Sequence, residues 1–259
     1  MTPRTHPVRH NVAADAEILR ALHVAGNPLL LANIWDPPTA RVVESAGMRA
    51  IATASAALAP ANGYEDHGKL PADVAFGALR RIAEAVSLPV TADLEDGYGL
   101  SAEDLAARVI DAGVCGLNLE DTDHDVNALV DGDKQAERIG AIKSAARALD
   151  VDVVVNARID VHFHRRNTEE GLQRARKYFD AGADCVYPIL LSDVSAIRAY
   201  VALGPTNVLW RPGGPRLGEL AKAQVSRISV GPFLHQLMLK HVGVATDALR
   251  RFEDDGIWK

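Results

Sequence analysis

The chain has 259 residues, of which 48% are hydrophobic and 24% are charged, and its formal net charge is −6. This composition indicates a globular protein with an ample core, and the lack of any basic block argues against nucleic acid as a partner. The length suits one large α/β barrel or two smaller domains. The N-terminal segment MTPRTHPVRHN lacks an apolar signal core, and no run of about 20 apolar residues occurs, so neither secretion nor a membrane span is expected.

The cysteines and the N-terminal residues allow two further expectations. Cys115 and Cys185 each lie in an apolar run, so we expect them to be reduced core residues, which favours a cytoplasmic location. Residues 1–12 are expected to form a flexible arm.

From Leu29 onward, short runs of branched and aliphatic residues alternate with segments of helical period. Eight runs are predicted to be strands, at residues 29–33, 50–55, 88–93, 115–120, 151–158, 184–189, 207–211 and 227–231. Helices are predicted at 13–25, 71–86, 102–112, 134–149, 169–181 and 194–203, and the first of these could close the bottom of a barrel. Apolar strands that alternate with amphipathic helices are typical of a parallel sheet covered on both faces. Eight such units in one domain predict a closed (β/α)₈ TIM barrel.

The C-terminal segment 233–252 is long for the last helix of a barrel. It can be interpreted as a helix packed on its own barrel or as an apolar element that docks on a neighbouring subunit. We favour the second interpretation slightly, and it predicts a homo-oligomer.

The run DLEDGYG, from Asp93 to Gly99, is the most informative motif. Residues i and i+2 of a strand point the same way, so Asp93 and Glu95 are predicted to share a face where the strand ends. Taken alone, the run is better interpreted as an ordinary acidic loop with a Gly-Tyr-Gly turn. The rest of the chain favours a site, because other polar residues follow other predicted strands.

In a (β/α)₈ barrel the catalytic groups lie at the carboxyl ends of the strands. That rule selects the following residues: Asn33, Asp36, Ser55, Asp93, Glu95, Glu120, Asp121, Arg158, Asp160 and Arg211. Several acids and an arginine brought together from separate strands indicate a functional site. Carboxylates without a His or Cys cluster are typical ligands of Mg²⁺, or of Mn²⁺.

The combination of DLEDGYG, NLEDT, NARID and SAALAPANGYED resembles the isocitrate lyase/phosphoenolpyruvate mutase superfamily, over roughly residues 33–231. The resemblance implies a (β/α)₈ barrel whose last helix is swapped between subunits, usually in a tetramer built as a dimer of dimers. It also implies Mg²⁺-dependent chemistry on a small 2-oxo or 2-hydroxy acid.

The same resemblance implies roles for individual residues. Asp93 corresponds to the direct Mg²⁺ ligand, and Glu95 and Glu120 to acids that hold metal-bound water. Asp66 corresponds to an aspartate near the reacting carbon. The substrate carboxylate would be held by Arg158 and by backbone amides around Ser55 and Ala56, with Arg211 as a further candidate for substrate binding.

One loop departs from the lyase pattern. Lyases of the superfamily carry a Lys-Lys-Cys-Gly-His or Lys-Arg-Cys-Gly-His loop after the fourth strand, whereas this chain has TDHDVNALVDG. Cleavage of isocitrate or methylisocitrate by that route is therefore not expected. Asn127 resembles the asparagine that phosphonomutases carry on this loop, after a one-residue shift.

Three functions remain open from the sequence. The first is a phosphonomutase or lyase that makes or breaks a C–C or C–P bond through an enolate. The second is a hydrolase or decarboxylase acting on phosphonopyruvate or oxaloacetate. The third is a barrel that binds 2-oxo acids without catalysis.

Overall fold

A computed structural model describes residues 7–8, 10–251 and 253, and most of the expected arm 1–12 lies outside that range. Of its described residues, Val8 donates a backbone hydrogen bond to the carbonyl of Glu84 (2.9 Å), and His10 contacts Asp15 through Nδ1 (2.6 Å). No helix in the described part of the chain is long and apolar enough to cross a membrane.

The strands form a closed parallel barrel, as the sequence predicts. Its strands are β1 (Leu29–Leu31) with β2 (Asn33–Ile34), β3 (Ile51–Thr53), β4 (Val90–Asp93), β5 (Gly116–Glu120), β8 (Val154–Ile159), β9 (Cys185–Pro188), β10 (Asn207–Leu209) and β11 (Arg227–Ser229). Hydrogen bonding follows the order β2-β3-β4-β5-β8-β9 in one sheet and β1-β11-β10 in the other. The ring closes because β1 and β2 are two halves of the first strand, and because a parallel bridge joins Val186 to Thr206.

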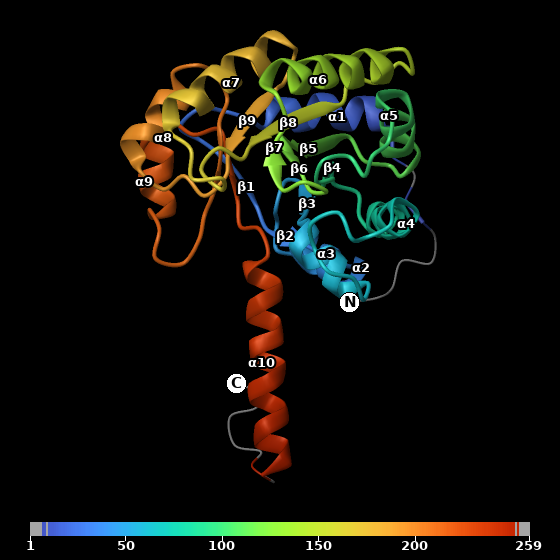
Figure 1. The fold of residues 1–259 in the computed structure, drawn as a ribbon. Helices are drawn as coiled ribbons and strands as arrows, with labels where there is room; N and C mark the ends of the chain where they lie inside the picture. Colours follow the sequence, from blue (N-terminus) through green and yellow to red (C-terminus); the bar gives the residue numbers. More distant parts are fainter. Residues whose placement is uncertain (1–6, 9, 252, 254–259) are drawn as a thin grey trace.

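Helices lie around this barrel, and a last helix leaves it (Figure 1). They are α1 (Val12–Ala21), α2 (Pro37–Ser45), α3 (Ser55–Ala61), α4 (Ala72–Ala83), α5 (Ala102–Asp111), α6 (Gly132–Arg147), α7 (Thr168–Asp180), α8 (Val194–Val201), α9 (Leu217–Lys222) and α10 (Phe233–Arg250). A short antiparallel hairpin, β6 (Thr122–Asp123) and β7 (Ala128–Leu129), follows β5. The expected strand ending at Ser55 stops at Thr53, and Ser55 instead begins α3.

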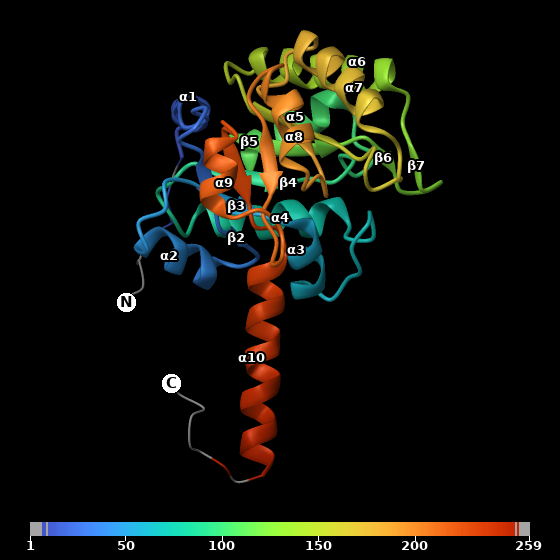
Figure 2. The ribbon, with the colours of Figure 1, turned by 90° about the vertical axis from the view of Figure 1, so that its left-hand side faces the viewer.

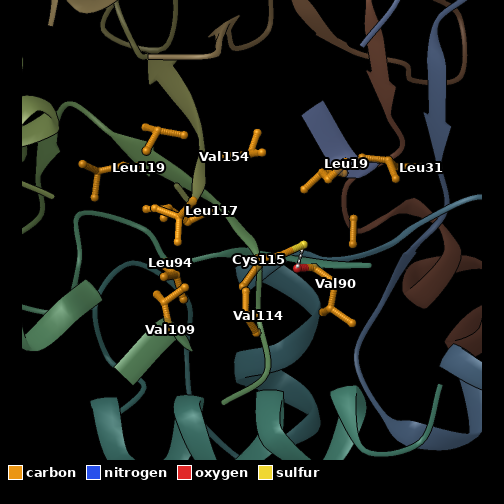
Figure 3. Packing of buried hydrophobic residues seen from close by; sticks show 14 of the residues in the cluster. Leu19, Leu31, Val90, Leu94, Val109, Val114, Cys115, Leu117, Leu119 and Val154 are labelled. Carbon is orange, nitrogen blue, oxygen red and sulfur yellow. Dashed lines mark hydrogen bonds between the residues drawn. The ribbon is translucent and has the colours of Figure 1, made fainter. Parts of the chain in front are cut away.

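The apolar core lies between the strands and the surrounding helices. Along β5, Leu117 and Leu119 are fully buried and point toward the helices, and Figure 3 shows Leu117 in the same group as Leu94 and Val109. The alternate residues Asn118 and Glu120 therefore point into the barrel, since strand side chains alternate between faces. The barrel interior is consequently polar where the strands end.

Helix α1 covers the amino ends of the strands, as the sequence suggested for the first helix. Its Leu19 is fully buried and packs so closely on β5 that a Cβ at Gly116 would lie 2.6 Å from Leu19 Cδ2. Arg20 donates to Asp184 Oδ1 (2.7 Å) and to the carbonyl of Asp152 (2.6 Å), both of which precede strands. The opposite, carboxyl end of the barrel is left open for a site.

Helix α10 does not pack along the barrel. In both views it projects away from the other elements (Figures 1 and 2). Only its first turn is held, where the buried His235 ring lies 4.7 Å from the ring of Trp35.

Two helical glycines give a direct test of this packing. A Cβ at Gly171 would lie 1.9 Å from Tyr200 Oη and 2.8 Å from Val161 Cγ2, both in fully buried side chains, whereas a Cβ at Gly140 would lie 3.6 Å from its nearest neighbour, the carbonyl of Ala181. We expect Gly171→Ala to lower the free energy of unfolding by about 1–3 kcal/mol through overpacking. Gly140→Ala, the matched control, should raise it by about 0.5–1 kcal/mol. Urea denaturation followed by circular dichroism measures both, and equal effects would contradict the packing described.

Candidate active site

A cavity of about 180 Å³ opens at the carboxyl ends of the strands. Residues predicted from the sequence line it, namely Asn33, Ser55, Ala56, Asp66, Asp93 and Arg158. These residues come from separate strands and loops, so the barrel brings together side chains that are more than 100 residues apart in the chain.

Asp93 is fixed at the floor of this cavity. It is the last residue of β4 and is 9% exposed. Its Oδ2 accepts hydrogen bonds from the backbone nitrogen and the hydroxyl of Ser55 (both 3.0 Å), and its own backbone nitrogen donates to Thr53 Oγ1 (3.1 Å). Asn118 Nδ2 lies 3.4 Å from the other oxygen, Oδ1. The end of β3 and the start of α3 thus set the direction of the Asp93 carboxylate.

Glu95 is buried beside Asp93. It is 1% exposed and has a positive φ of 52°, a conformation that side-chain-bearing residues seldom adopt. Oε2 accepts a hydrogen bond from the backbone nitrogen of Gly68, and Oε1 has no partner among the described residues. Burial, together with the charges of Asp66 and Asp93, raises the pKa of Glu95 to about 8.

Glu120 and Arg158 form an ion pair at the ends of β5 and β8. Arg158 Nη1 contacts Glu120 Oε2, while Nε and Nη2 donate to the two oxygens of Asp160 (2.7 and 3.0 Å). Burial alone would lower the pKa of Arg158, but the charges of Glu120 and Asp160 outweigh it and raise that pKa well above its ordinary value. Burial raises the pKa of Glu120 to about 7. The guanidinium is therefore a permanent cation among acids.

The donor set suits a hard divalent cation. The acids around the cavity offer only oxygen, and Glu95 Oε1 and Asp66 Oδ1 are buried without hydrogen-bond partners among the described residues. No three His, Cys, Asp or Glu side chains in the described part of the chain converge closely enough to bind one ion directly. That arrangement fits Mg²⁺, which typically takes one or two protein carboxylates and keeps several waters.

Two residues predicted to take part lie elsewhere. Asn127 is exposed at the turn between β6 and β7, and it lines a different cavity together with His164 and Arg166. Arg211 is exposed after β10 and does not line the cavity that contains Asp93. The structure therefore does not bring these two side chains to the other candidates.

Three of the residues selected at strand ends make contacts that hold the fold together. Asp36 caps α2 by accepting from the backbone nitrogen of Thr39 (2.8 Å). Asp121, fully buried, points toward α7, where it accepts from Tyr178 Oη (2.6 Å) and Arg174 Nη1 (3.1 Å). Asn33 lines the cavity, but its amide is bonded to backbone groups of Thr53, Val230 and Gly231.

The structure also shows site residues that the sequence analysis missed. His124 Nε2 lies 2.5 Å from Glu120 Oε1, and that hydrogen bond raises the pKa of His124. His67 lines the cavity mouth, with its ring 5.4 Å from that of His124. Asn118 could have been found from strand periodicity, because it precedes the inward-facing Glu120 by two residues. No comparable signal marks the two histidines, which lie on loops.

Comparison with known proteins agrees with this geometry. The family model described as phosphoenolpyruvate phosphomutase matches residues 19–250. An uncharacterised Mycobacterium tuberculosis protein, Rv1998c, is 32% identical over 213 residues, covering 81% of this chain and 80% of that protein. The 2-methylisocitrate lyase of Escherichia coli K12 is 30% identical over 198 residues, covering 72% of this chain and 66% of the lyase. The phosphonopyruvate hydrolase of Variovorax sp. Pal2 is 26% identical, covering 93% and 87%.

Solved structures show the same architecture. A phosphonomutase-like protein from Burkholderia cenocepacia J2315 superposes with a TM-score of 0.85 and 41% identity, covering 90% of this chain and 99% of that one. The relatives with named activities are lyases, mutases and hydrolases, and the expectation of an enzyme is confirmed. The chain belongs to the phosphoenolpyruvate phosphomutase family, within the isocitrate lyase/phosphoenolpyruvate mutase superfamily that its motifs resemble.

Proposed function

We propose that the protein is a Mg²⁺-dependent enzyme that makes or breaks a C–C or C–P bond of a small 2-oxo or 2-hydroxy acid through an enolate. The observation that carries this proposal is the arrangement of Asp93 and Arg158 on one cavity, with Glu120 in contact with Arg158. Two relatives whose names indicate cleavage of such compounds support it: a 2-methylisocitrate lyase and a phosphonopyruvate hydrolase.

The residues divide the work as follows. Asp93 would bind the ion directly, and Glu95 and Glu120 would hold its water ligands. Bound Mg²⁺ supplies a Lewis acid for the negative charge that grows on the enolate oxygen. Arg158 holds the substrate carboxylate and places a fixed positive charge opposite the acids. The backbone nitrogen of Ala56 would bind a substrate oxygen, whereas that of Ser55 already donates to Asp93 Oδ2. Asp66, which lines the cavity, would move a proton.

The hairpin β6–β7 favours hydrolysis or decarboxylation as a second candidate. Asp125, Val126 and Asn127 at its turn are exposed, and none of them lines the cavity. A reaction that rejoins two fragments must keep water out of the site. Because the turn of the hairpin does not cover the cavity, water can enter, which favours release of pyruvate from phosphonopyruvate or oxaloacetate.

Metal binding tests the first step. Isothermal titration of Mg²⁺, and of Mn²⁺, into the wild type should show one site, and Asp93→Ala should weaken it by at least tenfold because the direct ligand is lost. Asp125→Ala is the matched control, since it removes an exposed carboxylate that does not line the cavity. Equal affinity in the wild type and Asp93→Ala would defeat the metal assignment.

The reaction itself is tested with phosphonopyruvate, oxaloacetate and a panel of 2-hydroxy acids. Phosphorus NMR and pyruvate release separate mutase from hydrolase or decarboxylase. Arg158→Lys should lower kcat/KM by about 10²-fold, because one ammonium group cannot keep the contacts with Glu120 and with both oxygens of Asp160 while it binds the substrate carboxylate. Tight oxalate binding with no turnover of any compound would instead identify a non-catalytic binding barrel.

We also propose that α10 docks on a second copy of the chain. The helix projects from the barrel, and several large apolar side chains along it are one-third or more exposed: Leu234, Leu237, Met238, Leu239, Val242, Val244 and Leu249. An apolar surface of this extent on one helix is typical of a subunit interface. A closed dimer, or a tetramer built from two such dimers, would bury it.

Light scattering at micromolar concentration should therefore give the mass of a dimer or a tetramer. The double variant Leu239→Glu/Val242→Glu places two charges on one side of α10 and should dissociate the assembly. Lys240→Glu adds an acid to the same turn without removing apolar surface and should leave the mass unchanged. A monomeric wild type would contradict the proposed role of α10.

A further inference from the structure

The cavity has two chemically different sides. Asp66, Asp93 and Arg158 lie on one side, at β4, at β8 and on the loop after α3. The other side is formed at the ends of β9 and β10 and on the loop after β8, and its lining side chains are Tyr187, Ile189, Leu190, Leu209 and Phe163. A substrate held by its carboxylate on the first side can place its remaining substituent against the second.

The second side offers no charge for an anionic substituent. Among the described residues that line the cavity, Arg158 alone is a permanent cation, and Glu120 and Asp160 already pair with it. Arg211 is exposed and lies outside the cavity. An unpaired phosphonate or second carboxylate against this wall would lose its hydration without gaining a partner, which is costly.

Most of the neutral polar groups near this wall are also engaged, whereas the hydroxyl of Tyr187 has no hydrogen-bond partner among the described residues. Ser229 and Asn207 are hydrogen-bonded to each other through Asn207 Nδ2 and Ser229 Oγ (3.1 Å). Asn33 uses its amide oxygen to accept from the backbone nitrogens of Val230 (3.0 Å) and Gly231 (2.9 Å). His67 is a titratable group at the mouth, where its ring faces those of Phe163 and His124 (6.3 and 5.4 Å). Apart from the hydroxyl of Tyr187, the deeper wall therefore presents carbon.

The backbone is adapted to hold the apolar side chains in place. Leu190 has a positive φ of 63°, which is unusual for a large side chain, and it stays 40% exposed at the cavity. Gly231 has a φ of 55°, and a Cβ there would lie 2.9 Å from Leu209 Cδ1, so glycine makes room for Leu209. An exposed leucine held in a strained conformation indicates a contact surface for a ligand.

We propose that the substrate is a 2-oxo or 2-hydroxy acid whose far substituent is an uncharged alkyl group. The wall of Ile189, Leu190, Leu209 and Phe163 selects that group over a phosphonate or a second carboxylate. This inference rests on the first proposed function in its C–C form, since it assumes that Asp93, Mg²⁺ and Arg158 hold the oxo acid end, and it argues against phosphonopyruvate and oxaloacetate as substrates.

A matched pair of ligands tests the inference. Oxaloacetate and 4-methyl-2-oxopentanoate have side chains of nearly equal shape, and they differ in that one ends in a carboxylate and the other in two methyl groups. Each is titrated by calorimetry into the Mg²⁺-loaded protein, with pyruvate and oxalate as ligands that lack the long substituent. Each buried methylene contributes roughly fourfold in affinity, so 4-methyl-2-oxopentanoate should bind at least tenfold more tightly than pyruvate and oxaloacetate should bind less tightly than pyruvate.

Variants at the wall sharpen the test. Leu190→Lys adds a cation at an exposed position of the wall and should reverse the order of the two long ligands while oxalate affinity stays within about twofold. Leu149→Lys is the matched control, because Leu149 is similarly exposed (48%) and does not line the cavity. It should leave all four affinities unchanged.

The possible failures are distinguishable. If oxalate and pyruvate bind in the presence of Mg²⁺ but oxaloacetate binds more tightly than 4-methyl-2-oxopentanoate, the alkyl-substituent inference is overturned and the proposed function stands. If neither oxalate nor pyruvate binds, the proposed function itself fails, and the inference falls with it.

Discussion

The candidate site depends on the balance between its buried carboxylates and the positive charge of the Arg158 guanidinium. Asp93, Glu120 and Asp160 are nearly or fully buried, and Arg158 pairs with the last two. Buried carboxylates without enough positive charge take up protons, which is why burial raises the pKa of Glu95 to about 8 and that of Glu120 to about 7. A divalent cation would supply the missing charge. The same imbalance that would weaken an ordinary core thus agrees with the metal site proposed above.

A second cation lies deeper in the barrel and supports this site. Arg227 is 1% exposed, and its Nη2 donates to Asn118 Oδ1 (3.0 Å), which also accepts from Asn156 Nδ2 (2.8 Å). Asn118 in turn lies beside Asp93. TIM barrels usually fill this layer with branched apolar residues, so the polar layer here costs desolvation and lowers the pKa of Arg227. Its benefit is that the floor of the cavity is held by hydrogen bonds from several strands at once.

The sequence predicted the barrel well because its eight strands are apolar runs and its longer helices are amphipathic. It named no helix at α2, α3 or α9, and α3 has the sequence SAALAPA with no polar face to reveal its period. The strand-end rule selected Asp93, Glu120 and Arg158, which the barrel brings to one end, because each is the last or nearly the last inward-facing residue of its strand. The rule does not say whether a side chain points into the barrel or out of it, so it also selected Asp121. Because the preceding residue, Glu120, points inward, Asp121 points outward to α7. Loop residues such as Asn127 and His124 have no periodicity, and only the folded hairpin fixes where they lie.

The cavity and the projecting helix are connected through a few residues of the chain. Gly231 and Pro232 line the cavity, and α10 begins at Phe233. Asn33 holds the backbone of Val230 and Gly231, so one amide fixes both the rim of the cavity and the direction in which α10 leaves the barrel. His235 then packs on Trp35, one residue beyond β2, and anchors the first turn of α10. The first strand therefore positions the rim of the cavity and the start of α10 together, and through the bond from Asn33 to the carbonyl of Thr53 it is also connected to the strand end that holds Asp93.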